Sequence, residues 1–408
     1  MRCGLLGRKL GHSYSPQIHG CLGDYSYTLY EKEPQELADF LMSGDFTGLN
    51  VTIPYKKDVI PYCSQLTPCA KKLGAVNTIV RQPDGTLIGH NTDYFGFSSM
   101  VERSGLDLRE KEVLVLGSGG AAVTVLAVLE ELGAKGVVIS RTGSDNYDNL
   151  YLHKNAAAIV NATPVGMYPN VDDSPLDLSI FPKLEGVLDL VYNPARTSLL
   201  CQAESLGIVA QNGLWMLVAQ AKESAQWFTN SSIPDSIIPK IHNMLQKQME
   251  NIILLGMPGC GKSTVGKNLA MHLGKTFFDA DSEIEKEAGM PIPEIFSLHG
   301  EDTFRQLETN VLRRLGKQSG LVIATGGGCV TRSENYLPLH RNGRLIWLQR
   351  DVNKLPTDGR PLSQIGKLAD MYAVRKPLYQ QFSDITICND TSVEEAVDSI
   401  LTALDLEA

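Results

Sequence analysis

Short runs of aliphatic and β-branched residues alternate with stretches of helical periodicity along the whole chain. Two of these runs, residues 113–116 and 252–255, lead directly into glycine-rich segments. Strands that alternate with helices in this way are typical of α/β proteins with parallel sheets. We therefore predict an α/β fold in which each glycine-rich turn belongs to a sheet of its own.

A boundary between the two glycine-rich parts is predicted from a pair of helices. The apolar residues of 213–228 fall on one helical face, namely Leu214, Leu217, Val218, Ala221, Ala225 and Phe228. A loop follows, and then a second helical stretch from Pro234 to about Gln248 that ends almost directly on the next strand. Because 408 residues suit two or three domains, we expect one part to span residues 1–249 and another to span residues 250–408.

The composition narrows the class of protein without identifying it. Hydrophobic residues make up 43% and charged residues 20%, and the net charge of −9 argues against a nucleic-acid partner. No apolar run is long enough for a membrane span, and the N-terminal apolar stretch is too short for a signal-peptide core. The 8 cysteines are scattered and form no C-x-x-C pair, which is typical of free thiols in a reducing compartment. We expect a cytoplasmic protein that binds neither nucleic acid nor membranes.

The second glycine-rich segment matches a phosphate-binding loop. Residues 256–263 fit the pattern G-x-x-x-x-G-K-[ST] between a strand and a helix. In such a loop the backbone N–H groups surround the phosphates, the lysine balances their charge, and the hydroxyl serves Mg²⁺. We therefore expect a nucleoside triphosphate to be bound by Gly259, Gly261, Lys262, Ser263 and Thr264.

Carboxylates and arginines downstream suggest what receives the phosphoryl group. Asp279 and Asp281 follow Phe277 and Phe278 at i, i+2, and on a strand they would point to the same side. Such a pair could serve one metal and one hydroxyl nucleophile, although Asp279 could instead cap a turn. The other candidates are Arg305, which could instead pair with Glu308 one turn away, the glycines 326–328, Arg360 and Arg375.

These motifs, in this order, resemble shikimate kinase over residues 251–405. The resemblance implies that Mg²⁺ is held by Ser263 and Asp279, with Asp281 binding the shikimate hydroxyls and acting as base. It also implies ATP as the nucleotide. The substrate carboxylate would be held by Arg305 and Arg375, the ring would pack on Gly327 and Gly328, and Arg360 would reach the phosphate from a lid. The segment from Gln349 to Arg360 is shorter than in many members of that family.

The first glycine-rich segment suggests a dinucleotide. Residues 117–122, Gly-Ser-Gly-Gly-Ala-Ala, fit G-x-G-x-x-[GA] after a strand, a pattern that seats a pyrophosphate on a helix N-terminus. The next strand ends in Ser140-Arg141, where an NAD-preferring protein usually carries Asp or Glu. Arg141 could pair a 2′-phosphate, which favours NADP(H). The alternative is a solvated surface arginine.

Polar motifs flank this cofactor segment on both sides. Before it stand Ser13 and Ser15 in S-x-S-P, Thr52 and Lys56 in N-V-T-x-P-Y-K, then Asn77 and Asp93. After it stand Asn161, Tyr192, Gly213 and Gln220. Each has an ordinary alternative: Lys56 and Lys57 could be a solvated pair, Ser15-Pro16 a helix start and Asp93 part of a turn.

Together they resemble shikimate dehydrogenase over residues 1–249. The resemblance implies a substrate-binding part at 1–100 and about 213–249, and a Rossmann-like NADP part at about 101–212. Lys56 and Asp93 would be the acid/base pair. The substrate would be bound by Ser13, Ser15, Thr52, Asn77, Asp93, Tyr192 and Gln220. The cofactor would be bound by Gly117, Gly119, Gly120, Ala121, Arg141, Asn161 and Gly213.

One departure concerns the cofactor part. The stretch between Thr142 and the predicted strand at 156–160 is too short for a helical crossover plus a strand, which the family usually has there. We therefore expect a Rossmann-like sheet that is trimmed beside the adenosine end of the cofactor.

The two resemblances imply a bifunctional enzyme. Its first part would reduce 3-dehydroshikimate to shikimate with NADPH, and its second would phosphorylate shikimate with ATP and Mg²⁺. We expect a monomer or a homodimer. Two alternatives stay open: an active kinase fused to a catalytically weak dehydrogenase-like binding module, and a quinate/shikimate dehydrogenase that uses NAD. Ser15 and Arg141 count against the second.

Overall fold

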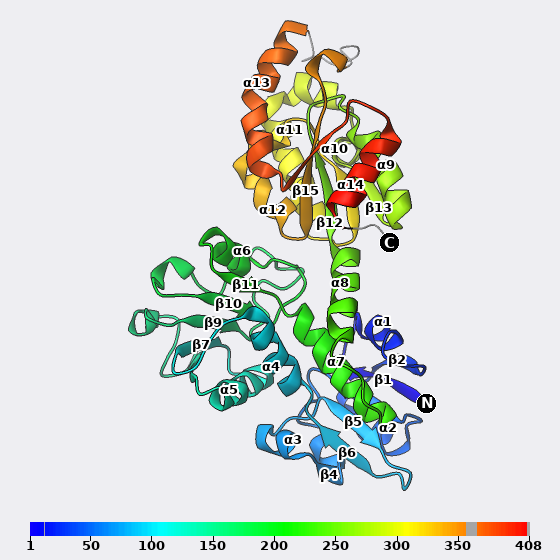
Figure 1. Cartoon of the computed structure of the whole chain (residues 1–408), viewed down its shortest axis with the longest axis vertical. Helices are drawn as coiled ribbons and strands as arrows, with labels where there is room; N and C mark the ends of the chain where they lie inside the picture. Colours follow the sequence, from blue (N-terminus) through cyan, green and yellow to red (C-terminus); the bar gives the residue numbers. More distant parts are fainter. Residues whose placement is uncertain (12, 356–364, 406–408) are drawn as a thin grey trace. The chain divides into compact units, whose positions relative to one another are not determined.

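The computed structural model describes residues 1–11, 13–355 and 365–405. These residues form an α/β fold with sheets of six, five and five strands, so the predicted fold class is confirmed (Figure 1). The chain divides into two compact units. Unit 1 comprises Met1–Met167, Asp172–Tyr192 and Thr197–Met244, and unit 2 comprises Tyr168–Val171, Asn193–Arg196 and Leu245–Ala408.

The first sheet belongs to unit 1 and is mixed, with the order β2-β1-β3-β5-β6-β4. Its strands are β1 (Arg2–Gly7), β2 (Ser26–Glu31), β3 (Gly48–Val51), β4 (Gln65–Leu66), β5 (Thr78–Arg81) and β6 (Leu87–His90). The helices of this region are α1 (Ser15–Gly20), α2 (Leu37–Ser43), α3 (Pro68–Leu73), α4 (Asp93–Ser104), α7 (Leu214–Thr229) and α8 (Ile237–Met249). Strands β3 and β6 both run antiparallel to β5, which places Asn50 opposite Thr78 and Thr78 opposite His90.

The second sheet of unit 1 is parallel throughout, with the order β11-β10-β9-β7-β8. Its strands are β7 (Glu112–Leu116), β8 (Lys135–Ile139), β9 (Ala158–Asn161), β10 (Gly186–Asp189) and β11 (Val209–Gln211), and α5 (Gly120–Glu131) and α6 (Ser198–Ser205) accompany them. Side chains of β7 alternate between two cores: Leu114 and Leu116 lie in one, and Val113 and Val115 in the other. Both faces of this sheet are therefore covered, as parallel sheets require.

Unit 2 contains the third sheet, also parallel, with the order β13-β14-β12-β15-β16. Its strands are β12 (Asn251–Leu255), β13 (Thr276–Asp279), β14 (Leu321–Ala324), β15 (Gly343–Gln349) and β16 (Ile385–Cys388). Its helices are α9 (Lys262–Leu273), α10 (Ala280–Ala288), α11 (Ile292–Gly316), α12 (Tyr336–His340), α13 (Ile365–Phe382) and α14 (Val393–Ala403). All five residues of β12 are buried, in the middle of this sheet.

The expected trimming of the second sheet is confirmed. Strand β8 ends the sheet and pairs with β7 alone, and residues 140–157 contain one regular element, the 3₁₀ turn Leu150–His153. A histidine ties this short connection to the sheet. His153 Nδ1 lies 3.0 Å from Glu112 Oε1, and its Nε2 lies 2.9 Å from Asp145 Oδ1.

The contacts of His153 with Glu112 and Asp145 predict a pH-dependent contribution to stability. Burial lowers the pKa of His153, but its bonds to Asp145 and Glu112 outweigh that effect, so the pKa is raised above 6.5. Lys135 also faces the group, through Glu112. A raised histidine pKa stabilises the fold fully below the unfolded pKa and loses this effect as the pH rises through the folded pKa. We expect His153→Gln to lower the melting temperature of unit 1 by about 2–4 °C at pH 6, for roughly 1 kcal/mol, and by much less at pH 9. Equal shifts at both pH values, measured by calorimetry, would contradict an ionic role for these contacts.

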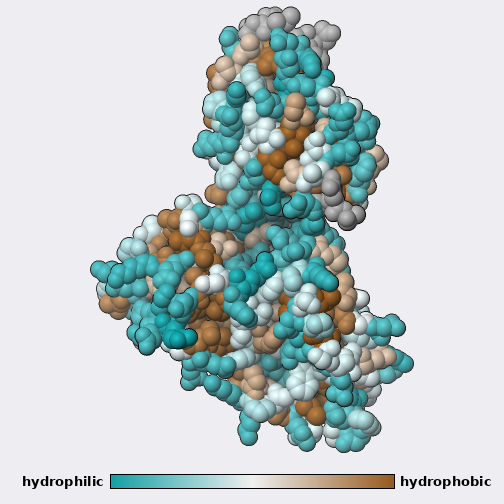
Figure 2. Space-filling view, viewed as in Figure 1, coloured by the Kyte–Doolittle hydropathy of each residue, from teal (hydrophilic) through white to brown (hydrophobic). Residues whose placement is uncertain are grey.

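The surface carries scattered apolar residues. On the face seen in Figure 2, hydrophobic side chains form separate patches between hydrophilic ones. Among the described residues, no helix is both long and apolar enough to cross a membrane.

Candidate active sites

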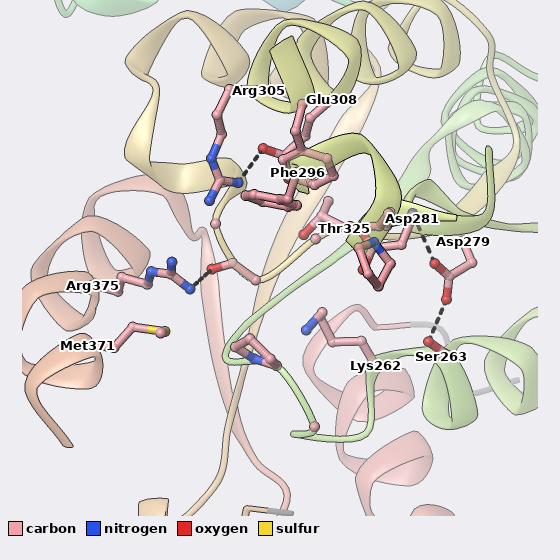
Figure 3. A pocket seen from close by; sticks show the side chains of 18 of the residues that line it. Lys262, Ser263, Asp279, Asp281, Phe296, Arg305, Glu308, Thr325, Met371 and Arg375 are labelled. Carbon is pink, nitrogen blue, oxygen red and sulfur yellow. Dashed lines mark hydrogen bonds and ion pairs between the residues drawn. The ribbon is translucent and has the colours of Figure 1, made fainter. Parts of the chain in front are cut away.

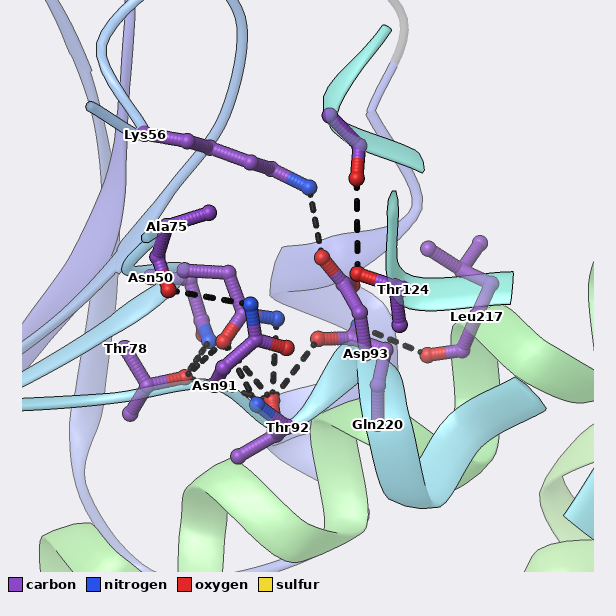
Figure 4. A network of polar contacts seen from close by, with 12 residues as sticks. Asn50, Lys56, Ala75, Thr78, Asn91, Thr92, Asp93, Thr124, Leu217 and Gln220 are labelled. Carbon is purple, nitrogen blue, oxygen red and sulfur yellow. Dashed lines mark hydrogen bonds and ion pairs between the residues drawn. The ribbon is translucent and has the colours of Figure 1, made fainter. Parts of the chain in front are cut away.

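The first candidate site lies where three strands of the first sheet begin or end. The register that joins Asn50, Thr78 and His90 brings the segments after β3, before β5 and after β6 together. Lys56 Nζ donates to Asp93 Oδ2 at 2.6 Å, and both side chains are partly buried, with 26% and 13% exposed (Figure 4). Lys57 is exposed. Lys56 therefore pairs with Asp93, the carboxylate predicted for it, whereas Lys57 is a surface residue.

A buried polar network lies behind this pair. Asn77 Oδ1 accepts from the Thr92 backbone N–H at 2.7 Å, and Asn77 Nδ2 donates to Thr92 Oγ1 at 3.0 Å. Thr92 also reaches Gln220 Oε1 at 3.5 Å, so three residues from separate parts of the chain are linked (Figure 4). Asn77 and Gln220, both predicted to bind substrate, thus lie in one network with Thr92, directly before Asp93.

Ser224 anchors this network from α7 and was missed in the sequence. Its hydroxyl lies 2.7 Å from Asn50 Nδ2 and 2.9 Å from both Thr78 Oγ1 and Thr92 Oγ1. The side chain is fully buried. A signal did exist, because Ser224 is a polar residue on the otherwise apolar face predicted for helix 213–228.

The remaining residues predicted to bind substrate are Ser13, Ser15 and Thr52, which lie near strands of the first sheet, and Tyr192, which follows a strand of the second. Ser13 Oγ accepts from the Ser15 backbone N–H at 3.2 Å, and Ser15 is the first residue of α1. Thr52 is tied to β1 through its backbone N–H, which donates to Leu6 O at 2.9 Å. Tyr192, after β10 of the second sheet, packs edge-on against Tyr14 with ring centroids 6.3 Å apart. The end of the second sheet therefore meets the serine motif of the first.

The predicted cofactor loop has the geometry of a phosphate site. Gly117 has φ 100°, and a Cβ atom there would lie 2.9 Å from Thr163 Cγ2. Helix α5 starts at Gly120, and open space surrounds Gly119 and Gly120. A helix N-terminus with open glycines offers its N–H groups to a phosphate. Arg141 is exposed just beyond the end of β8, next to this loop in the sheet order.

Two residues predicted to bind cofactor have structural partners instead of free polar groups. Asn161 is fully buried, and its amide donates to Asp189 Oδ1 at 2.9 Å while its oxygen accepts from Thr163 Oγ1 at 2.6 Å. A Cβ atom at Gly213 would lie 2.1 Å from Leu190 O. Both residues fix the backbone at the carboxyl ends of β9 and β10, so a contact with the cofactor would go through the backbone.

The second candidate site is a cavity of about 750 Å³ in unit 2. It is lined by the predicted Gly259, Gly261, Lys262, Ser263, Thr264, Asp279, Asp281, Arg305, Gly327, Gly328 and Arg375. Figure 3 shows Arg305 and Arg375 on one side of it and Ser263 with Asp279 on the other. Arg360 lies outside the described residues, and Lys354, between Gln349 and Arg360 in the sequence, donates to Asp390 O at 3.3 Å.

The phosphate loop is folded onto its own lysine. Lys262 Nζ donates to the carbonyl oxygens of Gly256 at 2.8 Å and Met257 at 3.0 Å. Gly256, Gly259 and Gly261 all have positive φ, which a glycine adopts without strain. Ser263 Oγ donates to Asp279 Oδ2 at 2.5 Å, so a hydroxyl and a carboxylate oxygen already converge. Oxygen ligands of this kind suit Mg²⁺.

The placement of Asp279 and Asp281 on one strand was wrong. Strand β13 ends at Asp279, and Asp281 lies in the first turn of α10. Asp279 is the N-cap of that helix, since its Oδ1 accepts from the Asp281 backbone N–H at 3.1 Å. An N-cap carboxylate satisfies otherwise unpaired N–H groups, and this preference outweighs strand continuation. The two carboxylates still face one cavity, because Asp279 reaches Ser263 while Asp281 points inward (Figure 3).

Asp281 is an unusual carboxylate. Its Oδ1 is buried without a hydrogen-bond partner among the described residues, and so is Glu308 Oε1. Burial raises the pKa of Asp281, and the nearby negative charge of Asp279 raises it further. Burial also raises the pKa of Glu308, against the lowering effect of Arg305. A carboxylate with a raised pKa is a stronger base than an ordinary one.

The two arginines surround the glycine run. A Cβ atom at Gly328 would lie 2.3 Å from Arg305 Nη1, and Arg375 Nη1 donates to Gly327 O at 3.0 Å. A Cβ atom at Gly327 would lie 2.5 Å from Pro258 Cδ in the phosphate loop. A side chain at Gly327 would collide with Pro258, and a side chain at Gly328 would displace the guanidinium of Arg305. Arg305 also pairs with Glu308 at 2.8 Å, so the alternative raised by the sequence is present as well.

Phe296 and Met371 also line the cavity and carried no signal in the sequence. Phe296 precedes a break in α11 at Gly300, where φ is 80° and ψ is 173°. The break gives the helix two segments, and both of them line the cavity. A helical pattern read through Gly300 cannot show this change of direction.

Comparisons with known families match both parts of the chain. Residues 5–79 match the shikimate dehydrogenase substrate binding domain, and residues 258–405 match shikimate kinase.

Individual relatives cover the N-terminal part. A shikimate dehydrogenase (NADP(+)) from Clostridium beijerinckii is 33% identical over 60% of this chain and 98% of its own length. The structure of shikimate dehydrogenase 1 from Peptoclostridium difficile is 37% identical, with a TM-score of 0.56 over 60% of this chain and 97% of its own. The Thermus thermophilus shikimate 5-dehydrogenase, solved with NADP(H) and shikimate, is 31% identical, with a TM-score of 0.55 over 60% of this chain and 99% of its own.

Proposed function

Because the chain belongs to the shikimate dehydrogenase family and carries a shikimate kinase domain behind that part, we propose that its two sites act in succession, the product of the first being the substrate of the second. The first reduces 3-dehydroshikimate to shikimate with NADPH. The second transfers a phosphoryl group from ATP to shikimate, giving shikimate 3-phosphate. The observation that carries the proposal is the presence of both a Lys56–Asp93 pair and a phosphate loop facing two arginines.

In the first site, side chains of the protein would supply the proton that the substrate gains on reduction. NADPH supplies a hydride to the carbonyl carbon, and the oxygen must gain a proton at the same time. Lys56 and Asp93, whose Nζ and Oδ2 atoms lie 2.6 Å apart, would bind the carbonyl oxygen as the acid/base pair. Asn77, Thr52 and Gln220 would hold the ring hydroxyls, and Ser13 and Ser15 the carboxylate. The hydrogen bonds that link Asn77, Thr92 and Ser224 hold the Asn77 side chain in place before the substrate binds.

Arg141 is proposed to select the phosphorylated cofactor. It is exposed beyond β8, on the side where the sheet is trimmed, so a 2′-phosphate would meet its guanidinium without competition from a neighbouring strand. We expect Arg141→Ala to raise the KM for NADPH about 10–100-fold, since one charged hydrogen bond contributes roughly 1.5–3 kcal/mol. The KM for NADH should change less than twofold. Steady-state kinetics with both cofactors measures this, and equal changes would argue against the assignment.

In the second site the substrate hydroxyl attacks the γ-phosphorus, its proton passes to Asp281, and ADP leaves. Arg305 and Arg375 would hold the substrate carboxylate as bidentate forks, with the ring over Gly327 and Gly328. Lys262 would leave the carbonyls of its own loop for the β- and γ-phosphates. The unpartnered Oδ1 of Asp281 is the proton acceptor, and its raised pKa suits that role.

We propose that Ser263 and Asp279 would hold Mg²⁺, which would replace the hydrogen bond between their side chains. Their oxygens converge at 2.5 Å, and the cavity supplies room for the nucleotide phosphates beside them. A bound Mg²⁺ would offset negative charge on the transferring phosphate. We also propose a cytoplasmic location, which the free thiols at all 8 cysteine positions support.

Two separate assays test the proposal. Purified protein should oxidise NADPH with 3-dehydroshikimate, and it should release ADP from Mg·ATP with shikimate. ADP release without NADPH oxidation would mean that the first part is a binding module. Oxidation rates with NAD that exceed those with NADP, and with quinate that exceed those with shikimate, would instead favour a quinate/shikimate dehydrogenase.

A further inference from the structure

Arg305 is held by two carboxylates of its own helix. Its Nη1 donates to Glu308 Oε2 at 2.8 Å, while Nε and Nη2 both donate to Glu301 Oε1, at 3.3 and 3.2 Å. The two carboxylates differ in their surroundings: the Glu308 side chain is 0% exposed and that of Glu301 is 61% exposed. Breaking a buried ion pair is costly, whereas an exposed one gives way readily. Arg305 therefore has one lasting partner and one displaceable partner.

The displaceable partner occupies the edge that an incoming carboxylate needs. The Nε and Nη2 groups of an arginine form a fork that binds the two oxygens of a carboxylate in parallel. Glu301 meets this fork with a single oxygen, and both distances exceed the 2.7–2.9 Å or so that is usual for charged hydrogen bonds. A ligand carboxylate that used both oxygens would form a better pair at the same edge.

The backbone gives Glu301 room to leave. It directly follows the break at Gly300, where φ is 80° and ψ is 173°, and so begins the second segment of α11 four residues before Arg305. A Cβ atom at Gly300 would meet nothing within 4 Å. Because 61% of the Glu301 side chain is exposed, its carboxylate can turn into water.

We infer that Glu301 takes the place of the acceptor's carboxylate: it pairs with the Nε/Nη2 edge of Arg305 before the substrate binds and yields that edge when the substrate binds. The inference rests on the proposed role of Arg305 as a carboxylate clamp. Glu301 is a positioning residue, since it acts through Arg305. It also places a second negative charge on Arg305 beside a loop that binds phosphates, so that a phosphate group does not settle on Arg305 in place of the substrate.

The kinase kinetics of Glu301→Gln test this inference. Removing the competing charge should lower the KM for shikimate about threefold to fivefold, the factor that displacement of one exposed ion pair implies. The kcat and the KM for ATP should change less than twofold. Benzoate, a ring carboxylate without hydroxyls, should inhibit competitively against shikimate, with an inhibition constant that falls by the same factor. Asp302→Asn, which removes a charge from an exposed residue on the same turn, should change none of these values.

Other results of these measurements would contradict the inference. A raised or unchanged KM in Glu301→Gln would mean that Glu301 only orients Arg305 or does nothing, and would overturn the inference. In an Arg305→Lys background, Glu301→Gln should no longer lower the KM, because lysine lacks the fork. A fall of the same size there would show a general charge effect. A wild-type chain that phosphorylates no shikimate would contradict the proposed function itself, whereas an active wild type with an unresponsive Glu301→Gln contradicts this inference alone.

Discussion

Lys56→Ala is expected to lower the turnover of the dehydrogenase reaction about 10²–10⁴-fold, the range over which a positioned proton donor acts. Lys56 Nζ lies 2.6 Å from Asp93 Oδ2, and no second lysine shares this position, since Lys57 is exposed. Alanine would leave Asp93 without its partner and the carbonyl oxygen without a proton source. The rate of NADPH oxidation at saturating 3-dehydroshikimate measures the effect.

The adjacent lysine is the matched control for this change. Lys57→Ala removes the same charge one residue away and should change turnover less than twofold. ADP release with shikimate should remain at the wild-type rate in both variants. A Lys56→Ala protein that keeps more than a tenth of its dehydrogenase activity would show that the proton comes from elsewhere.

Lys262→Ala is expected to have the reciprocal effect, lowering kcat/KM of the kinase reaction about 10²–10³-fold or more. Lys262 is the charged residue of the phosphate loop and begins the helix that follows it. Its side chain is buried, and its ammonium group donates to two carbonyl oxygens of the loop. Without it, the β- and γ-phosphates lose their cation, and the loop carbonyls lose their donor. Rates of ADP release over a range of ATP concentrations give the loss.

Lys267 on the same helix provides the comparison. It is exposed and lies over the ring of Phe277, 6.0 Å from the centroid, so Lys267→Ala should leave kinase kinetics within twofold of wild type. NADPH oxidation should be unaffected in either variant. If Lys262→Ala or Lys56→Ala abolished both reactions, the two sites would not be independent.

Local patterns made the strand–turn–helix elements predictable. The glycine loops after residues 113–116 and 252–255 were expected between a strand and a helix, and the structure has β7 before α5 and β12 before α9. The shortened connection after Arg141 was also visible, because chain length alone limits what can be built there. Such features depend on few residues that are close in sequence, so long-range packing did not need to be known.

Contacts between side chains that are far apart in the sequence were harder to predict from the sequence. Asp279 and Asp281 were placed on one strand because their spacing fits a two-residue period, yet the capping preference of Asp279 starts a helix there. Ser224 joins Asn50, Thr78 and Thr92 only when the sheet register and α7 are known. Phe296 enters the cavity because the helix breaks at Gly300, a property of one backbone torsion. Pairing of Lys56 with Asp93 was inferred from family resemblance, and the structure supplies its distance.

The central claim is that one chain carries out two consecutive reactions, and formation of shikimate 3-phosphate from 3-dehydroshikimate measures it most directly. Purified protein would be given 3-dehydroshikimate, NADPH and Mg·ATP, and the phosphorylated product followed by mass spectrometry. We expect wild type to form it, Lys56→Ala and Lys262→Ala each to form almost none, and a mixture of the two variants to restore it. No product from wild type, with shikimate or unreacted 3-dehydroshikimate accumulating instead, would contradict the account.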